Sequence, residues 1–264
     1  TQGVNILMNL YFGVAVNAAR GVATQVDAAL KQFVNNFTTA VNPQITKSYA
    51  QGDLDYMHKL VCRSAKFSAF LMMFFAVPII LETNTILTIW LKTVPDYAVI
   101  FLQWIIISSF MDTVLANSLV TSMFATGKIK RYQIIVTTVG CLVFPLSWIA
   151  FKLGFEPQVG YILYFIIYTI LLFVRLYLLK DMVKLPVMMY IREVLYKLVP
   201  VIVVGFAIPG ILILTMDAGW LRLILVCLLS VLVTAASEYF IGLSNKEKDF
   251  VAEKIKLVIG KIKK

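Results

Sequence analysis

Residues 20–42 read RGVATQVDAALKQFVNNFTTAVN and form a segment long enough to cross a bilayer. Polar side chains recur along this segment at steps of three or four residues. That spacing places them on one side of a helix. The members of this polar row are Arg20, Thr24, Asp27, Lys31, Asn35, Thr38 and Asn42.

The polar row predicts a hydrated interior within the membrane. An ionised Asp or Lys at the bilayer centre costs about 2.5–3.5 kcal/mol even on the lenient insertion scale, so we do not expect the row to face lipid. Asp27 and Lys31 are four residues apart and can pair. A structural ion pair within a helix bundle would explain these two residues but not the other polar ones. We interpret the whole row as a substrate-binding surface, and because Arg20 makes it net cationic, it favours an anionic passenger such as a phosphate or pyrophosphate.

The composition excludes a water-soluble protein. Apolar residues make up 60% of the chain, charged residues make up 14%, and the mean hydropathy is +0.86. This leaves too little polar surface to coat a soluble fold. We expect an all-α, polytopic membrane helix bundle of seven or eight transmembrane helices. The candidate spans cover residues 3–16, 17–46, 61–81, 97–126, 130–152, 158–180, 197–216 and 220–243.

The first candidate span is short and carries Asn5 and Asn9, which indicates a truncated helix. The sequence also opens on Thr1, with no basic flank of a signal peptide before it. We therefore expect the chain to be a piece of a longer protein.

The positive charge alternates between the two ends of the predicted spans. Most of the 24 lysine and arginine residues fall on alternate junctions and on the C-terminal tail. The other junctions carry only Lys92, Lys152 and Arg222. The positive-inside rule therefore predicts that the C-terminus is cytoplasmic. Because this distribution accounts for the net charge of +10, no nucleic-acid partner is expected.

Two further stretches are apolar on one side and basic on the other. Residues 185–196 and the tail 244–264 are predicted to lie on the inner membrane surface as amphipathic helices. Such helices bind anionic lipids, so membrane lipids are an expected partner. A protein partner is the alternative for the tail.

Asp112 lies near the centre of the fourth span, with Ser108, Ser109 and Asn117 close in sequence. A carboxylate within the membrane is a functional candidate by default. We consider it a possible coupling residue: a cation or proton site, or a partner for a basic residue across the lumen. The alternative is a protonated Asp that is hydrogen-bonded to a neighbouring helix.

Three other ionisable residues are predicted to have ordinary roles. Arg175 and Glu238 lie late in their spans, where they are expected to reach the inner interface. His58 is expected to be a solvated loop residue. The three cysteines are expected to be small buried hydrophobes without metal spacing; they are Cys62, Cys141 and Cys227.

The sequence shows no glycine-rich phosphate loop, no metal-spaced histidine pair and no nucleophile elbow. We therefore expect no enzyme activity, no cofactor and no metal site.

Several local patterns carry a resemblance to a known family. They are GVNILMNLYFG at 3–13, VNAARG at 16–21, NPQITKSYA at 42–50 and WLKTVPDY at 90–97. These patterns resemble the O-antigen-type and lipopolysaccharide-biosynthesis flippases of the multidrug/oligosaccharidyl-lipid/polysaccharide exporter superfamily. The likeness runs through roughly the first half of the chain.

The resemblance implies two six-helix lobes around a central cavity, followed by two more helices. On that plan, residues 1–183 correspond to the second lobe, 184–243 to an interfacial helix and the two additional transmembrane helices, and 244–264 to a basic tail. The first lobe is missing and would come from the same gene or a separate chain. The resemblance further implies that Arg20 and Lys31 hold the pyrophosphate of an undecaprenyl-diphosphate-linked oligosaccharide, which is flipped across the bacterial inner membrane by alternating access.

Two other functions remain open at this point. A cation-coupled multidrug antiporter of the same superfamily is one alternative, although it is expected to have a more acidic and aromatic cavity. A membrane-embedded sugar transferase is the other alternative, although the sequence offers no candidate catalytic residue for it.

Overall fold

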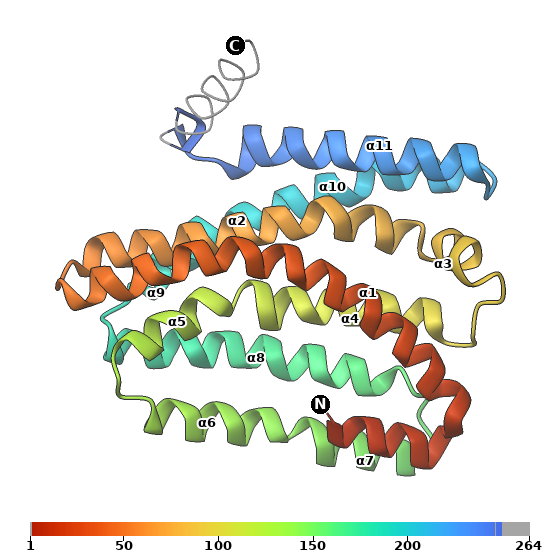
Figure 1. The fold of residues 1–264 in the computed structure, drawn as a ribbon, viewed down its shortest axis with the longest axis horizontal. Coiled ribbons are helices and arrows are strands. Elements are labelled where there is room, and N and C mark those ends of the chain that lie inside the picture. Colours follow the sequence, from red (N-terminus) through yellow and green to blue (C-terminus); the bar gives the residue numbers. More distant parts are fainter. Residues whose placement is uncertain (1, 246, 250–264) are drawn as a thin grey trace.

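The computed structural model describes residues 2–245 and 247–249. All elements in these ranges are helical. They run side by side along the length of the molecule, with α6 and α7 at one edge and α11 at the opposite edge (Figure 1). The elements are α1 (Gln2–Ala50), α2 (Leu54–Leu81), α3 (Thr83–Leu91), α4 (Ala98–Ser109), η1 (Phe110–Val114), α5 (Asn117–Ala125), α6 (Lys130–Cys141), α7 (Val143–Lys152), α8 (Val159–Met182), α9 (Val187–Tyr190), η2 (Ile191–Leu195), α10 (Tyr196–Thr215), α11 (Trp220–Ser237) and η3 (Glu238–Gly242).

Within the described residues, 7 helices are long and apolar enough to cross a membrane. The predicted all-α bundle is therefore confirmed, and the chain is a multi-pass membrane protein. Several of the shorter elements join end to end to make these helices. They cover Gln2–Ala50, Leu54–Leu81, Ala98–Ala125, Lys130–Lys152, Val159–Met182, Val187–Thr215 and Trp220–Gly242.

Helix α1 contains a sharp bend at Gly13. The backbone there has φ 79° and ψ −171°, a conformation that is essentially restricted to glycine. We predicted a boundary between spans at residues 16 and 17, whereas the structure places the bend at Gly13. The arm from Gln2 to Phe12 is about 16 Å long at 1.5 Å per residue. This is about half of the ~30 Å hydrocarbon thickness, and the arm lies beside α7 (Figure 1).

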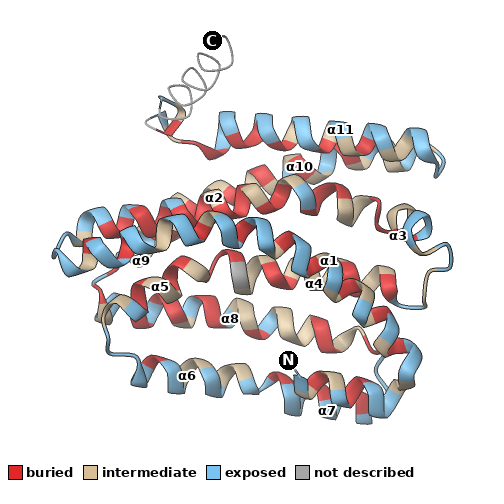
Figure 2. Ribbon diagram, in the orientation of Figure 1, coloured by how far each residue is buried: buried red, intermediate tan, exposed pale blue. Residues whose placement is uncertain are grey.

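The interior of the bundle is built around α2, and α1 packs against α2 and α4. In the apolar window of α2, 61% of the residues are buried, compared with 17% for the helix formed by α6 and α7. The same contrast is visible in Figure 2. Ala19 and Ala23 of α1 are fully buried. Such small residues allow helix backbones to approach closely, which is the usual basis of helix packing in membranes.

The predicted surface helix at 185–196 is helical, but it is not a separate element. Residues Val187–Thr215 form one continuous helix of 29 residues, in which η2 is a π-helical segment. The structure therefore joins the predicted interfacial segment to the spanning helix that follows it, and the division of 184–243 stays a prediction. Of the predicted tail 244–264, only residues 244, 245 and 247–249 lie within the described part of the chain.

Candidate functional site

A cavity of about 190 Å³ lies between α1, α4 and α8. Both arms of α1 contribute to it, on either side of the bend at Gly13. Most of the polar residues come from the long arm of α1 and from the facing sides of α4 and α8, and the short arm adds one, Asn5. The lining residues are Val4, Asn5, Met8, Arg20, Thr24, Asp27, Lys31, Ile105, Ser108, Ser109, Gly160, Tyr161 and Tyr164.

The structure divides the predicted polar row into two parts. The first four members, from Arg20 to Lys31, line the cavity. The other three do not. Asn35 is exposed, Thr38 is buried and donates to the Asn35 carbonyl at 3.1 Å, and the Asn42 side chain donates to Asn117 Oδ1 at 3.4 Å. These last three residues therefore lie further along α1, beyond the lining of the pocket.

Asp27 and Lys31 form the predicted ion pair. Lys31 Nζ lies 2.7 Å from Asp27 Oδ2. The Asp27 side chain is 5% exposed and the Lys31 side chain is 30% exposed, so the lysine lies on the more open side. The second carboxylate oxygen, Asp27 Oδ1, is buried and has no hydrogen-bond partner among the described residues. Arg20 has no ion-pair partner among the described residues. The cavity therefore has two cations, Arg20 and Lys31, and one anion, Asp27.

Asp112 lies in the π-helical segment η1, next to the cavity. A π-helix has a wider turn, and such turns are frequent at functional sites. Tyr164 Oη donates to Asp112 Oδ2 at 2.8 Å, and Arg175 Nη2 lies 3.8 Å from Asp112 Oδ1. Among our alternatives for Asp112, this geometry matches a partner for a basic residue. Because Tyr164 also lines the cavity, it connects the Asp112–Arg175 pair to the pocket.

Tyr161 and Tyr164 were not predicted as site residues. They lie three residues apart on α8, and Tyr164 stacks on Tyr168 with ring centroids 4.1 Å apart. The hydroxyl of Tyr161 is buried without a partner among the described residues. Their spacing of three and four residues is a visible signal in the sequence, but tyrosine is common in membrane helices and does not stand out as a charged residue does.

Three expectations about ionisable residues are wrong. Arg175 and Glu238 are buried, with 6% and 7% of their surface exposed, and do not reach out to the interface. His58 is also buried, and its Nε2 lies 2.9 Å from the Val183 carbonyl oxygen. For His58 the reason is that α2 begins at Leu54, where Asp53 caps it, rather than at the predicted residue 61. Arg175 is buried beside Asp112, and Glu238 lies in η3, which packs against α10.

The cysteines fit their prediction only in part. Cys62 is buried, Cys227 is partly buried and Cys141 is exposed. Across the described ranges, no group of three or more His, Cys, Asp or Glu side chains could hold a metal ion. The chemistry of the cavity therefore rests on its cations, one carboxylate and hydroxyl groups.

Comparisons with protein families, with curated proteins and with solved structures find no match to this chain.

Proposed function

We propose that the chain forms part of a transporter that moves a lipid-linked oligosaccharide, of the undecaprenyl-diphosphate type, across the bacterial inner membrane by alternating access. The observation that carries this proposal is the cavity beside a membrane-crossing helix in which Arg20 and Lys31 accompany a single carboxylate, Asp27. A site with an excess of cations in a low-dielectric surrounding attracts a diphosphate. Arg20, which has no carboxylate partner in the described residues, is the first contact in this scheme, because a guanidinium can bind phosphate through two donors.

The size of the cavity supports a binding mode in which only one part of the transported molecule lies inside it. A volume of about 190 Å³ is below the ~300–1,000 Å³ of pockets that hold drug-sized ligands. It suits a diphosphate group rather than an oligosaccharide. In this proposal the sugars lie along the outer side of α1.

That side of α1 is polar and exposed. Such a surface on a membrane-crossing helix is costly against lipid and favourable against water or sugar hydroxyls. Gln32 and Asn36 already pair along it at 3.1 Å. The exposed polar residues are Gln25, Gln32, Asn35, Asn36, Thr39 and Gln44.

The test is the double variant Arg20→Ala/Lys31→Ala in the full-length protein that contains this segment. We expect surface polysaccharide to fall strongly at an unchanged level of membrane-inserted protein. The charge-preserving variant Arg20→Lys/Lys31→Arg controls for packing and is expected to retain more export than the alanine pair. Normal polysaccharide in the alanine pair would remove these two residues from the transport role.

A cation-coupled multidrug antiporter is the second candidate, and one observation favours it. The cavity has two aromatic hydroxyls, Tyr161 and Tyr164, close to Asp27 and Asp112. Acidic and aromatic groups are the surroundings that an organic cation requires. Resistance to ethidium on expression, lost in Asp27→Asn, would favour this function over flipping.

A further inference from the structure

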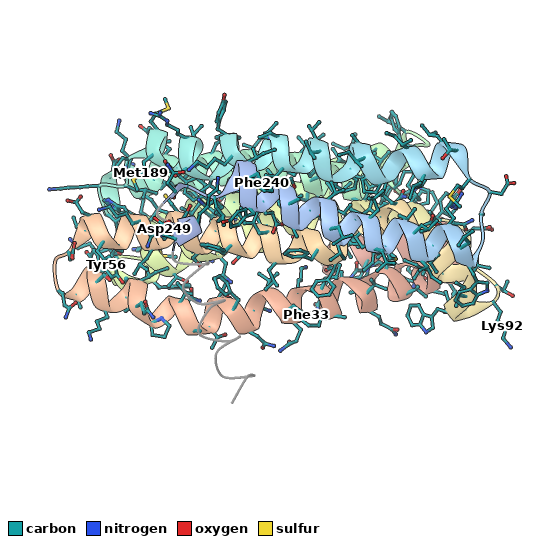
Figure 3. All side chains as sticks on the ribbon, turned by 90° about the horizontal axis from the view of Figure 1, so that it is seen from above. Phe33, Tyr56, Lys92, Met189, Phe240 and Asp249 are labelled. Carbon is teal, nitrogen blue, oxygen red and sulfur yellow. The ribbon has the colours of Figure 1, made fainter. Side chains whose placement is uncertain are left out.

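A second cavity, of about 360 Å³, lies between the first half of α2, the α9–η2 segment and the chain that follows η3. It shares no lining residue with the first cavity. It lies toward the end of the bundle that the positive-inside rule assigns to the cytoplasm. Figure 3 shows Met189 and Asp249 toward that end, together with Tyr56 and opposite Lys92. The lining residues are Lys59, Cys62, Arg63, Lys66, Met189, Glu193, Ser244 and Glu247.

Three basic residues line this cavity from one face of α2. Lys59, Arg63 and Lys66 follow one another at steps of four and three residues, so they lie above one another on the helix. Lys66 is at the floor, with only 1% of its surface exposed. Lys59 and Arg63 are exposed at the rim. The three cations therefore form a row along α2 that runs from the aqueous surface into the protein.

The two carboxylates of the cavity already have close partners. Lys66 Nζ lies 2.6 Å from Glu247 Oε2, and Ser244 donates to the same oxygen from its backbone nitrogen at 2.9 Å and its hydroxyl at 2.7 Å. Glu193 lies 2.6 Å from Lys197, one helical turn further on. Arg63 reaches Glu247 only at 3.9 Å, with 47% of its side chain exposed.

The cavity therefore retains an unbalanced positive charge at its rim. Within the described residues, Lys59 has no ion pair, and the single contact of Arg63 is long and exposed. An exposed ion pair of this kind contributes little. These two side chains are free to bind an anion that enters from the membrane surface.

The position of the cavity indicates where that anion comes from. Met189 and Cys62 add apolar surface beside the cations, and the spanning helix that contains α11 ends at Gly242, two residues before Ser244. The cavity is thus at the level where a membrane helix meets the interface. Basic pockets between transmembrane helices on the cytoplasmic side are suited to anionic lipid headgroups.

We infer that this cavity binds the phosphate of an anionic membrane phospholipid, with Lys59 and Arg63 as its ligands and with Met189 against the glycerol and the first part of the acyl chains. Glu247 holds Lys66 in place at the floor and prevents a second anion from entering more deeply. This site is separate from the transport cavity, and its existence does not depend on the proposed function.

The test uses the purified full-length protein in nanodiscs that contain phosphatidylcholine with an increasing fraction of phosphatidylglycerol. Native mass spectrometry then counts the phosphatidylglycerol that remains bound. Taking about a fivefold factor for each of the two cations that contact the lipid phosphate, Lys59→Ala/Arg63→Ala is expected to weaken retention about 25-fold. Both side chains are exposed, so we expect this variant to fold.

The matched control is Lys128→Ala/Lys130→Ala, which removes two exposed positive charges from the α5–α6 connection and the first residue of α6, at the same end of the bundle. This control is expected to retain phosphatidylglycerol as the unchanged protein does. Equal losses in the two double variants would show that general surface charge is responsible and would overturn the site. A further arm adds inorganic phosphate in the millimolar range. Displacement of the lipid by phosphate would overturn the lipid assignment in favour of a free phosphate, whereas continued retention supports it.

Discussion

At the scale of single residues, the most informative group is Asp112 with Arg175 and Tyr164. Arg175 has an 8% exposed side chain, and its Nε and Nη1 atoms are buried without partners in the described part of the chain. A buried charge of this kind is stable only with a counterion close by. Asp112 supplies that counterion, and the tyrosine hydroxyl satisfies the other carboxylate oxygen.

This group makes a prediction about coupling between Asp112 and Arg175. Arg175→Gln leaves Asp112 without its cation, and Asp112→Asn leaves Arg175 without its anion, so each single variant is expected to lower the thermal stability in detergent. The double variant removes both charges and is expected to be more stable than the sum of the two losses predicts. The interaction free energy from this double-mutant cycle is expected to be about 0.5–3 kcal/mol. Strict additivity would show that the two groups do not interact.

A second residue-scale prediction concerns Gly13. A Cβ at this position would meet no atom within 4 Å, so only the backbone conformation opposes a side chain. Gly13→Ala is expected to destabilise the protein by about 1–3 kcal/mol. Gly21→Ala is the matched control, because Gly21 is also free of contacts within 4 Å but lies in regular helix. It is expected to stabilise by about 0.5–1 kcal/mol. Thermal unfolding of both variants measures the difference, and equal shifts would contradict the argument.

At the scale of elements, the last spanning helix and the chain that follows it are attached to α2 by two ion pairs, one directly after the end of α2 and one near its middle. Toward the end that we assign to the outside, Arg222 binds Glu82 through two nitrogens at 2.7 and 3.1 Å, and the Glu82 side chain has no exposed surface. Near the middle of α2, Lys66 binds Glu247. Between them, a Cβ at Gly205 would stand 3.5 Å from the side chains of both Met73 and Thr234, so the absence of a side chain there lets the helices pack closely. The ion pairs therefore fix the ends of an interface whose middle is packed through small residues.

The outer attachment predicts a large effect of one substitution. Arg222→Ala leaves Glu82 charged and buried without its counterion, which for a buried pair costs about 3–5 kcal/mol. Arg192→Ala is the control, because Arg192 is exposed and its removal is expected to change stability little. Thermal unfolding and limited proteolysis at residues 216–219 measure the effect. Equal stability of the two variants would show that the Arg222–Glu82 pair does not attach α11.

At the scale of the whole molecule, the sequence predicted the architecture well. Length and hydropathy identified the spanning helices, because the bilayer fixes both quantities for any helix. The periodicity of the polar row correctly placed Arg20, Thr24, Asp27 and Lys31 on one side of α1. Helical periodicity alone could not show where the neighbouring helices stop, which is why Asn35, Thr38 and Asn42 were assigned to the same site.

The remaining errors concern contacts between distant parts of the chain. Arg175 meets Asp112, and His58 meets Val183, 125 positions further along. The sequence carries no local pattern that would predict either contact, because tertiary packing brings the two residues of each pair together. Residues late or early in a span were therefore assigned to the interface, although neighbouring segments bury them.

A pH dependence is also predicted for the whole molecule, from Glu247, which lies outside the spanning helices. Burial acts to raise the pKa of Glu247, but the hydrogen bonds from Lys66 and Ser244 outweigh it, and the pKa is lowered. A lowered pKa in the folded state stabilises the fold at pH values above the ordinary glutamate pKa of about 4.3, and this contribution is lost as the pH falls further. The difference in melting temperature between the unchanged protein and Glu247→Gln is therefore expected to be constant from pH 5 to 7 and to shrink below about pH 4. A difference that persists undiminished at pH 3 would contradict the assignment.

The bend at Gly13 has a mechanical consequence for the first cavity. Val4 and Met8 precede this bend, and Arg20, Thr24, Asp27 and Lys31 follow it. Residues from both arms nevertheless line the same cavity. Rotation about two backbone torsions of a single glycine therefore changes the separation of opposite walls without unfolding either arm. A change in these two torsions alone would therefore widen or narrow the cavity.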